Sequence, residues 1–317
     1  MDWHCLRESR AYDETVPELP EVEVLVRHLH PLLVGRTVQR VQVSRSKVAA
    51  PTPVGVLRRA LNGFTFMNIT RRGKYLLFEC RGRGRRRCVK VMGHLGMTGR
   101  MYLQSARSPL PKHASVVLNC GAENFVFEDT RYFGRFTLDP GALTNLGPEP
   151  LSSEFTPDSF SRVLARSSQP IKIRLLDQRV VAGLGNIYAS EALFRAGISP
   201  MAPARSLTGE QIRGLWRAIR RVLRDAITRG STVPLDFPGA GRRDGLFYFG
   251  STNSTPAGYE EWLAVYDREG SPCPKCGTAI ERFMQAARST FFCPKCQSAR
   301  RMGEQGRRRK KDCLKSQ

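Results

Sequence analysis

Acidic residues and long apolar runs are both scarce in this sequence. Its 317 residues include 51 Lys and Arg but only 28 Asp and Glu, so the formal net charge is +23 and the sequence pI is about 10.4. Such a surplus predicts a polyanionic partner, either nucleic acid or an anionic membrane. The sequence contains no run of about 20 apolar residues, which is the length that a helix needs to cross a bilayer. Residues 1–16 carry charges of both signs and no apolar core, which excludes a secretory signal. We therefore expect nucleic acid as the partner and the cytoplasm as the location.

The nine cysteines fall into two groups. Five are scattered and are expected to be reduced thiols: Cys5, Cys80, Cys88, Cys120 and Cys313. The other four form two C-x-x-C pairs separated by sixteen residues, Cys273 with Cys276 and Cys293 with Cys296. This spacing predicts four thiolates around one Zn²⁺ ion, with no open coordination position. The expected zinc ion is therefore structural.

The order of predicted elements indicates an α+β chain with several domains. Short strand-like runs separated by Gly, Pro or polar clusters predict a β-sandwich, with strands expected at 37–43, 64–70, 75–80, 89–92, 101–103, 115–118, 125–127 and 133–138. Helical spacing predicts helices at 54–61, 159–165, 172–176, 187–196 and 209–229. The expected segments are a leader (1–16), a sandwich domain with a leading helix (17–146), a helical domain (147–258), a zinc-finger hairpin (259–297) and a disordered basic tail (298–317) that adds salt-sensitive affinity for DNA.

One stretch near the start of the chain combines two prolines with three carboxylates, Pro17-Glu18-Leu19-Pro20-Glu21-Val22-Glu23. Pro20 suits the first turn of a helix, where a missing backbone N–H is not needed. Acidic side chains there also favour the positive end of the helix dipole. Apolar residues then recur at helical spacing as far as Leu33. By these features alone the stretch is a well-capped start of an amphipathic helix.

The same stretch resembles the amino terminus of the formamidopyrimidine-DNA glycosylase and endonuclease VIII family, whose mature chains begin Pro-Glu-Leu-Pro-Glu-Val-Glu. In that family the first residue is the proline, and its free secondary amine is the nucleophile, so the resemblance implies this role for Pro17. A proline nitrogen inside a chain is an amide and cannot attack. Val16 directly precedes the motif, as a misread GTG start codon would give. We therefore expect residues 1–16 to be an artefact of start-codon assignment or to be cleaved.

Further motifs follow in the family's order over roughly residues 17–297. Arg71-Arg72-Gly73-Lys74 is by itself a charged turn, and the resemblance implies that Lys74 holds the phosphate next to the lesion. In the loop His94-Leu95-Gly96-Met97-Thr98-Gly99, the resemblance implies that Met97 is a wedge that enters the base stack. His94 is expected to support this loop or to touch phosphate.

The partner loop reads Asp129-Thr130-Arg131-Tyr132-Phe133-Gly134, where the family usually has Asp-Pro-Arg-Arg-Phe-Gly. The resemblance implies that Arg131 hydrogen-bonds the orphaned base opposite the lesion and that Phe133 wedges beside it. Thr130 and Tyr132 depart from the usual pattern. Tyr132 stands where the family has its second arginine, so the resemblance leaves open whether this loop makes the phosphate contact of that arginine.

Three features of the second half complete the resemblance. Gly183-Leu184-Gly185-Asn186 precedes a predicted helix and is similar to the family's helix–two-turn–helix signature, which implies that Asn186 binds phosphates flanking the lesion. Glu191, in the following helix, is expected to be structural. Arg288 matches a phosphate-gripping arginine at the family's zinc-finger tip. Residues 231–258 are expected to be a mobile loop that caps an everted purine, although they do not closely match the common version.

Together the resemblance implies a bifunctional DNA glycosylase and AP lyase of base excision repair. An enzyme that cleaves a glycosidic bond within a duplex must first turn the nucleotide out. Pro17 would attack the sugar to form a Schiff base, and β,δ-elimination would cleave the strand without a metal. Glu18 would protonate the opening sugar ring, while Glu21 would anchor the helix start through backbone N–H groups. Lys74 and Arg288 would complete the catalytic set. The expected substrates are 8-oxoguanine and formamidopyrimidines in damaged double-stranded DNA, and the expected oligomeric state is a monomer.

Two other functions remain open at this point. An enzyme of the endonuclease VIII type would use the same chemistry on oxidised pyrimidines. A catalytically silent, zinc-containing DNA-binding protein would result if residues 1–16 stay attached. The Leu-Pro after Glu18, the set of Met97, Arg131 and Phe133, and the long loop before the cysteine pairs favour the purine branch.

Overall fold

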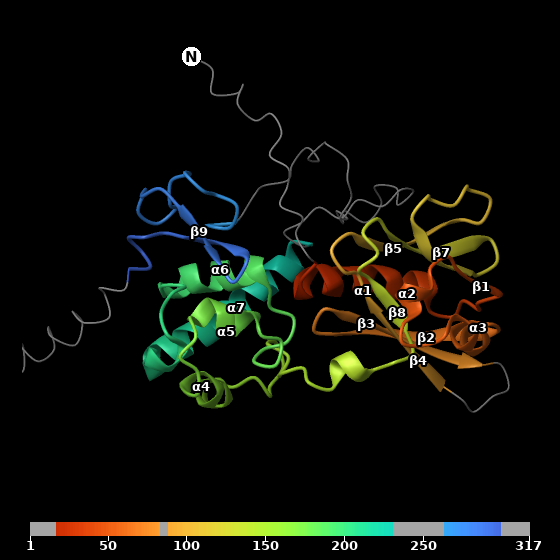
Figure 1. Cartoon of the computed structure of the whole chain (residues 1–317), viewed down its shortest axis with the longest axis horizontal. Coiled ribbons are helices and arrows are strands. Elements are labelled where there is room, and N and C mark those ends of the chain that lie inside the picture. Colours follow the sequence, from red (N-terminus) through yellow and green to blue (C-terminus); the bar gives the residue numbers. More distant parts are fainter. Residues whose placement is uncertain (1–16, 83–87, 231–262, 299–317) are drawn as a thin grey trace, which may run out of the picture. The chain divides into compact units, whose positions relative to one another are not determined.

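The computed structural model describes residues 17–82, 88–230 and 263–298. The predicted leader, the predicted capping loop at 231–258 and all of the predicted basic tail except residue 298 lie outside these described residues. The chain divides into two compact units, and the division along the sequence follows Thr144. Figure 1 shows the elements of both units.

The first unit contains two four-stranded antiparallel sheets and a long leading helix, α1 (Leu19–Leu33). One sheet has the order β1-β6-β7-β5 and the other the order β2-β3-β4-β8. The strands are β1 (Arg40–Val43), β2 (Phe64–Arg72), β3 (Tyr75–Gly82), β4 (Cys88–His94), β5 (Gly99–Ser105), β6 (Ala114–Asn119), β7 (Glu123–Asp129) and β8 (Arg135–Thr137). The remaining helices are α2 (Ser46–Ala49), α3 (Val54–Leu61) and the 3₁₀ turn η1 (Gly141–Leu143). The predicted α+β class is confirmed.

Aromatic side chains from both sheets meet in the core of this unit. The ring of Phe125 on β7 lies 5.7 Å from that of Phe78 on β3 and 6.0 Å from that of Phe136 on β8, between ring centroids. All three side chains are fully buried. Burial of a side chain of this size stabilises the fold by about 2–3 kcal/mol. The alternating pattern of the strands thus produces a sandwich.

Two strands begin later than the sequence-based prediction places them. The strand expected at 37–43 begins at Arg40, and Thr37 makes only an isolated bridge with Thr65. The strand expected at 133–138 begins at Arg135. Phe133 and the glycine after it belong instead to a loop in which the backbone N–H of that glycine bonds to a side chain rather than to a neighbouring strand. Alternation of apolar residues does not reveal such a side-chain partner.

The second unit is helical and carries a hairpin. Its elements are α4 (Pro157–Ala165), α5 (Ile171–Leu176), α6 (Asn186–Ala196), the 3₁₀ turn η2 (Ala204–Ser206), α7 (Gly209–Thr228), β9 (Glu281–Gln285) and β10 (Arg288–Phe292). Thr156 and Thr208 cap α4 and α7 through their side chains, which explains where both helices begin. The amphipathic α7 buries its apolar face, and its Trp216 Nε1 donates to the carbonyl of Phe155 at 2.7 Å.

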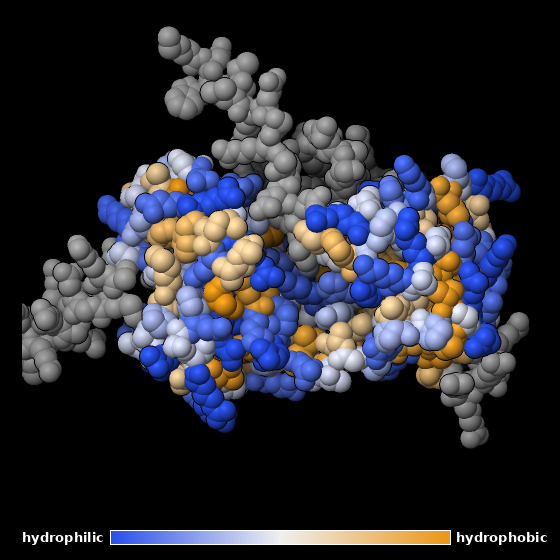
Figure 2. All heavy atoms as spheres, viewed as in Figure 1, coloured by the Kyte–Doolittle hydropathy of each residue, from blue (hydrophilic) through white to orange (hydrophobic). Residues whose placement is uncertain are grey.

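Hydrophilic side chains are interspersed with smaller hydrophobic areas on the face drawn in Figure 2. Among the described residues, no helix has the length and apolar character needed to cross a membrane. Some large apolar side chains are exposed, among them Phe133 at 49 % and Met284 at 61 %. Phe133 belongs to the loop that the sequence marks as a DNA contact.

Candidate nucleic-acid interface and metal centre

Pro17, Glu18 and Glu21 are buried together at the N-terminal end of α1. Glu18 and Glu21 are only 2 % and 1 % exposed. The backbone N–H of Glu18 donates to Glu21 Oε2 at 2.9 Å, as part of a reciprocal cap between the two residues. This is the kind of backbone contact expected of Glu21 from the sequence.

A partly buried ion pair ties α1 to the turn that carries Lys74. Arg71 Nε lies 2.9 Å from Glu23 Oε2, and Arg71 Nη1 donates to the carbonyl of Gly73 at 3.0 Å. Burial raises the pKa of Glu23, but hydrogen bonds from Arg71 and Arg27 outweigh it, so that pKa lies below its usual range. The sequence marked Arg71 only as part of a charged turn. The sequence did not indicate its partner, because Glu23 lies 48 residues earlier in the chain.

His94 supports the loop that carries Met97. Its Nδ1 accepts the backbone N–H of Gly96 at 3.0 Å, and its ring packs on Tyr75 with centroids 4.8 Å apart. Burial, followed by repulsion from Lys74 and Arg135, lowers the pKa of His94 to about 4. The imidazole is therefore neutral at physiological pH. Of the two predicted roles, loop support fits these contacts better than a charged contact with phosphate.

Asp129 closes the loop between β7 and β8. This carboxylate is 1 % exposed. Its Oδ1 accepts the hydroxyl of Thr98 at 2.7 Å and the N–H of Arg131 at 3.2 Å, and its Oδ2 accepts the N–H of Gly134 at 2.7 Å. Charged acceptors make stronger hydrogen bonds than neutral ones. Asp129 thus holds the backbone on both sides of Tyr132 and ties it to the loop that carries Met97.

Tyr132 stands between Arg131 and Phe133 in a left-handed conformation, with φ of 57°. Such a conformation costs a residue other than glycine roughly 1–2 kcal/mol. Two contacts hold the ring: its hydroxyl lies 2.8 Å from His113 Nδ1, and the guanidinium carbon of Arg45 lies 3.9 Å from its centroid. The sequence marked Tyr132 only as a departure from a pattern. Neither His113 nor Arg45 belonged to any motif, so no signal predicted this cluster.

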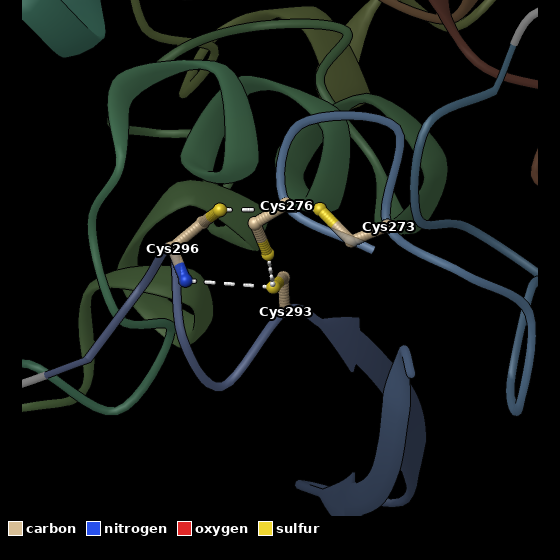
Figure 3. Close-up of side chains that lie close together, drawn as sticks. All are labelled: Cys273, Cys276, Cys293 and Cys296. Carbon is tan, nitrogen blue, oxygen red and sulfur yellow. Dashed lines mark hydrogen bonds between the residues drawn. The ribbon is translucent and has the colours of Figure 1, made fainter. Parts of the chain in front are cut away.

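The four predicted zinc ligands converge in the second unit (Figure 3). Their sulfur atoms all lie within 4.8 Å of one another, with Cys276 Sγ 3.5 Å from Cys293 Sγ and Cys273 Sγ 3.9 Å from Cys296 Sγ. A tetrahedral site with Zn–S bonds of about 2.3 Å requires S···S separations of about 3.8 Å. The four thiols therefore suit one zinc ion, as predicted, and leave no coordination position for a substrate.

A buried lysine joins the zinc hairpin to the helical part of the second unit. Lys172 on α5 is 1 % exposed, and its ammonium donates to the carbonyl of Ser289 at 2.8 Å and to Thr290 Oγ1 at 2.7 Å. Asn186 Nδ2, at the start of α6, donates to the same carbonyl at 3.0 Å. Ser289 follows the exposed Arg288. This network connects the positions of Asn186 and Arg288, and no sequence motif had indicated the role of Lys172.

Glu191 on α6 anchors the chain as it enters the zinc-binding segment. Its carboxylate accepts the backbone N–H groups of Ala264, Val265 and Tyr266 at 2.9–3.0 Å. Burial raises the pKa of Glu191, and these hydrogen bonds act in the opposite direction. The contacts fit the structural role that the sequence suggested for this residue.

The predicted site residues thus fall into two sets. The first unit contains Pro17, Glu18, Glu21, Lys74, His94, Met97, Arg131 and Phe133, and the second contains Asn186, Arg288, Cys273, Cys276, Cys293 and Cys296. Within the first unit, direct contacts join the loops of His94 and Asp129. Within the second, they join Asn186 to the hairpin of Arg288.

Three family profiles match the chain. The formamidopyrimidine-DNA glycosylase N-terminal domain matches residues 16–136, the formamidopyrimidine-DNA glycosylase H2TH domain matches residues 146–235, and a zinc finger found in FPG and IleRS matches residues 270–299. A formamidopyrimidine-DNA glycosylase of Thermus thermophilus is 43 % identical over 290 residues, which cover 89 % of this chain and 98 % of the relative. One from Paracoccus denitrificans is 40 % identical over 298 residues, which cover 89 % of this chain and 100 % of the relative.

Solved structures of Lactococcus lactis Fpg are similar as well. A mutant of that enzyme in complex with DNA containing Fapy-dG matches with a TM-score of 0.78 and 32 % identity, over 89 % of this chain and 100 % of that one. A complex of Lactococcus lactis Fpg with DNA containing an abasic site also matches with a TM-score of 0.78 and 32 % identity, over 89 % of this chain and 99 % of that one. The likeness therefore extends through both units of the chain.

Proposed function

Because this chain belongs to the formamidopyrimidine-DNA glycosylase family, we propose that it is a bifunctional DNA glycosylase and AP lyase of base excision repair. Its substrates are oxidised purines, 8-oxoguanine and formamidopyrimidines, in double-stranded DNA. Relatives named as formamidopyrimidine-DNA glycosylases and solved complexes with lesion-containing DNA support this proposal. The bacterial origin of these relatives supports a cytoplasmic location, close to the chromosome.

The observation that carries the proposal is the burial of two carboxyl groups beside Pro17 at the start of α1. The prolyl nitrogen, when it is the uncapped start of the chain, attacks the anomeric carbon of an everted nucleotide. The N–C bond forms, the glycosidic bond breaks, and the damaged base leaves with its electron pair and takes up the proton that the prolyl nitrogen loses. Glu18 protonates the ring oxygen as the sugar opens, and an iminium ion results. This cation acidifies the neighbouring sugar proton, so that loss of the 3′ phosphate and then of the 5′ phosphate follows by elimination.

Other residues of the chain hold the DNA in place for this reaction. Lys74, in a turn tied to α1 by the ion pair of Arg71, binds the phosphate next to the lesion. Asn186 and Arg288 bind further phosphates from the second unit. Such contacts position the duplex and read no sequence, as a repair enzyme requires.

Further residues contact the base stack and hold the zinc hairpin. Met97 and Phe133 fill the space left by the everted nucleotide, and Arg131 contacts the orphaned base. The four cysteines would hold one zinc ion that supports the hairpin of Arg288, and because they fill its coordination positions it would take no part in the chemistry.

Covalent trapping with borohydride tests the proposal, because only an amine nucleophile leaves a reduced adduct on the DNA. Two chains are compared on duplexes that contain 8-oxoguanine opposite cytosine, one beginning at Pro17 and a matched control beginning at Met1. The start of each chain is verified by intact mass. We expect an adduct with the first chain only. Glu18→Gln in the first chain is expected to slow adduct formation while DNA binding persists.

A chain that demonstrably begins at Pro17, binds damaged DNA and never forms an adduct would overturn the enzymatic proposal. A zinc-containing DNA-binding protein would then be the better description. Substrate choice is tested separately by comparing release of 8-oxoguanine with release of thymine glycol. Preferential release of thymine glycol would assign the protein to the endonuclease VIII type of activity.

A further inference from the structure

A cation is held in place directly beside the loop of Arg131 and Phe133. The guanidinium of Arg45 lies over the ring of Tyr132 at 3.9 Å, a short cation–π contact. The tyrosine hydroxyl lies 2.8 Å from His113 Nδ1, so the ring is fixed at its far end as well. Arg45 itself is exposed to solvent. These contacts restrict the position of the guanidinium before any ligand arrives.

The cavity at this cluster suits an anion. It has a volume of about 310 Å³, and its lining includes Arg45, Lys112, His113 and the hydroxyl-bearing Ser44 and Tyr132. No acidic side chain is among the described residues that line it. The lining thus offers two positive charges and several hydrogen-bond donors. A phosphodiester has the charge and the acceptor oxygens that such a lining binds.

We propose that Arg45, held by Tyr132, binds a phosphodiester of the undamaged DNA strand next to the orphaned base. The assignment of the strand rests on the proposed function, in which Arg131 contacts the base opposite the lesion. Tyr132 is the next residue along the chain, and a base and its flanking phosphates belong to one strand. The cation that Tyr132 holds therefore lies beside the backbone of the strand that carries this base. Lys112 adds a second charge to the same cavity.

Tyr132 acts in this arrangement as a positioning residue. Its ring orders Arg45, which reduces the entropy that the long side chain loses when it binds phosphate. Its backbone belongs to the loop that Asp129 closes, so the phosphate contact and the contact with the orphaned base are connected through consecutive residues. Binding of the undamaged strand at Arg45 therefore favours the correct placement of Arg131.

Neutralisation of single phosphates tests the proposal. Binding of the full chain is measured by fluorescence anisotropy on duplexes that carry a tetrahydrofuran abasic analogue, with one phosphate of the undamaged strand replaced by a methylphosphonate. We expect Arg45→Gln to weaken binding to the unmodified duplex about tenfold. The slope of log K against log salt should fall by about 0.9 in magnitude. One neutral linkage near the orphaned base should weaken wild-type binding about tenfold and Arg45→Gln binding by less than about twofold.

Two further positions make the test specific. Arg58→Gln removes the same charge from an exposed position on α3, and it should leave the effect of every neutral linkage unchanged. Tyr132→Phe retains the aromatic ring and loses only the hydroxyl, so Arg45 should still respond to the neutral linkage. Tyr132→Leu removes the ring and should reproduce Arg45→Gln.

Equal losses for Arg45→Gln and Arg58→Gln would overturn the proposal, because the effect would then reflect net charge alone. It would also be overturned if each neutral linkage weakened wild-type and Arg45→Gln binding equally, or if Arg45 coupled only to linkages of the damaged strand. These readouts are equilibrium affinities. A chain that forms no borohydride adduct, but in which Arg45 still couples to a neutral linkage of the undamaged strand, would retain the phosphate contact and overturn only the proposed function. Failure of the proposed function and failure of this proposal are therefore distinguishable.

Discussion

Asp129→Asn tests how the loop that carries Arg131 and Phe133 is held, because it removes one hydrogen-bond acceptor at nearly constant size. The side chains are nearly equal in size, but the amide replaces one acceptor oxygen by a donor NH₂ group. If the NH₂ group takes the place of Oδ2, it opposes the N–H of Gly134, whose hydrogen bond is 2.7 Å long. If it takes the place of Oδ1, it opposes the N–H of Arg131, which still has Thr98 Oγ1 as an acceptor at 3.2 Å. Either orientation leaves a backbone donor of the loop without this acceptor.

The magnitude follows from the burial of this carboxylate. Asp129 is 1 % exposed, so water does not readily replace the lost acceptor. A hydrogen bond to a charged group contributes about 1.5–3 kcal/mol, and an unpaired buried N–H costs about 1–3 kcal/mol. We expect the free energy of opening of this loop to fall by about 2–3 kcal/mol. At about 1.4 kcal/mol per factor of ten, amide exchange in the loop should be about 30- to 150-fold faster.

Native-state hydrogen exchange of the Gly134 and Arg131 amides measures this effect directly. The matched control is Asp139→Asn, in which a carboxylate at an exposed turn accepts the N–H of Gly141 at 3.1 Å and an amide oxygen can take over the bond. Equal exchange rates in Asp129→Asn and Asp139→Asn would refute the reasoning.

The remaining predictions concern pH and zinc. The pKa of His94 falls from 6.5 in the unfolded chain to about 4 in the folded protein. As the pH falls from about 6.5 towards 4, the unfolded state therefore binds a proton that the folded state does not, and the free energy of unfolding decreases. Between about pH 6.5 and 5 the wild-type protein should lose about 1–2 kcal/mol of stability in urea denaturation, and an equal loss in His94→Gln would contradict the assignment. Zinc removal by a chelator, or Cys293→Ser, should release the hairpin of Arg288 and weaken DNA binding at least about tenfold. Cys88→Ser, at an exposed cysteine outside the cluster, should retain zinc and affinity, and undiminished binding by the zinc-free protein would contradict this prediction.

Motifs with local physical causes could be identified from the sequence. The spacing of the four cysteines predicted a four-thiolate site, because each C-x-x-C knuckle brings its own two sulfurs together locally and two such knuckles supply four ligands. The prolines and carboxylates before Val22 predicted the start of α1, because helix capping depends on neighbouring residues. The order of strands and helices followed from hydrophobic periodicity, since each element must bury one face. The resemblance to a family rested on these local motifs and on their order.

Contacts between distant segments required the tertiary structure. Asp129 marked a motif in the sequence, but its bond to Thr98 depends on how two loops meet. Arg71 pairs with the carboxylate of Glu23 on α1, and Lys172 donates to a backbone carbonyl on the zinc hairpin. Arg45 reaches the ring of a tyrosine far along the first unit's sequence. Side-chain partners of this kind are chosen by packing and distance, which composition and periodicity do not encode. The sequence alone therefore determined which motifs are present, and only the fold decided which residues hold them in place.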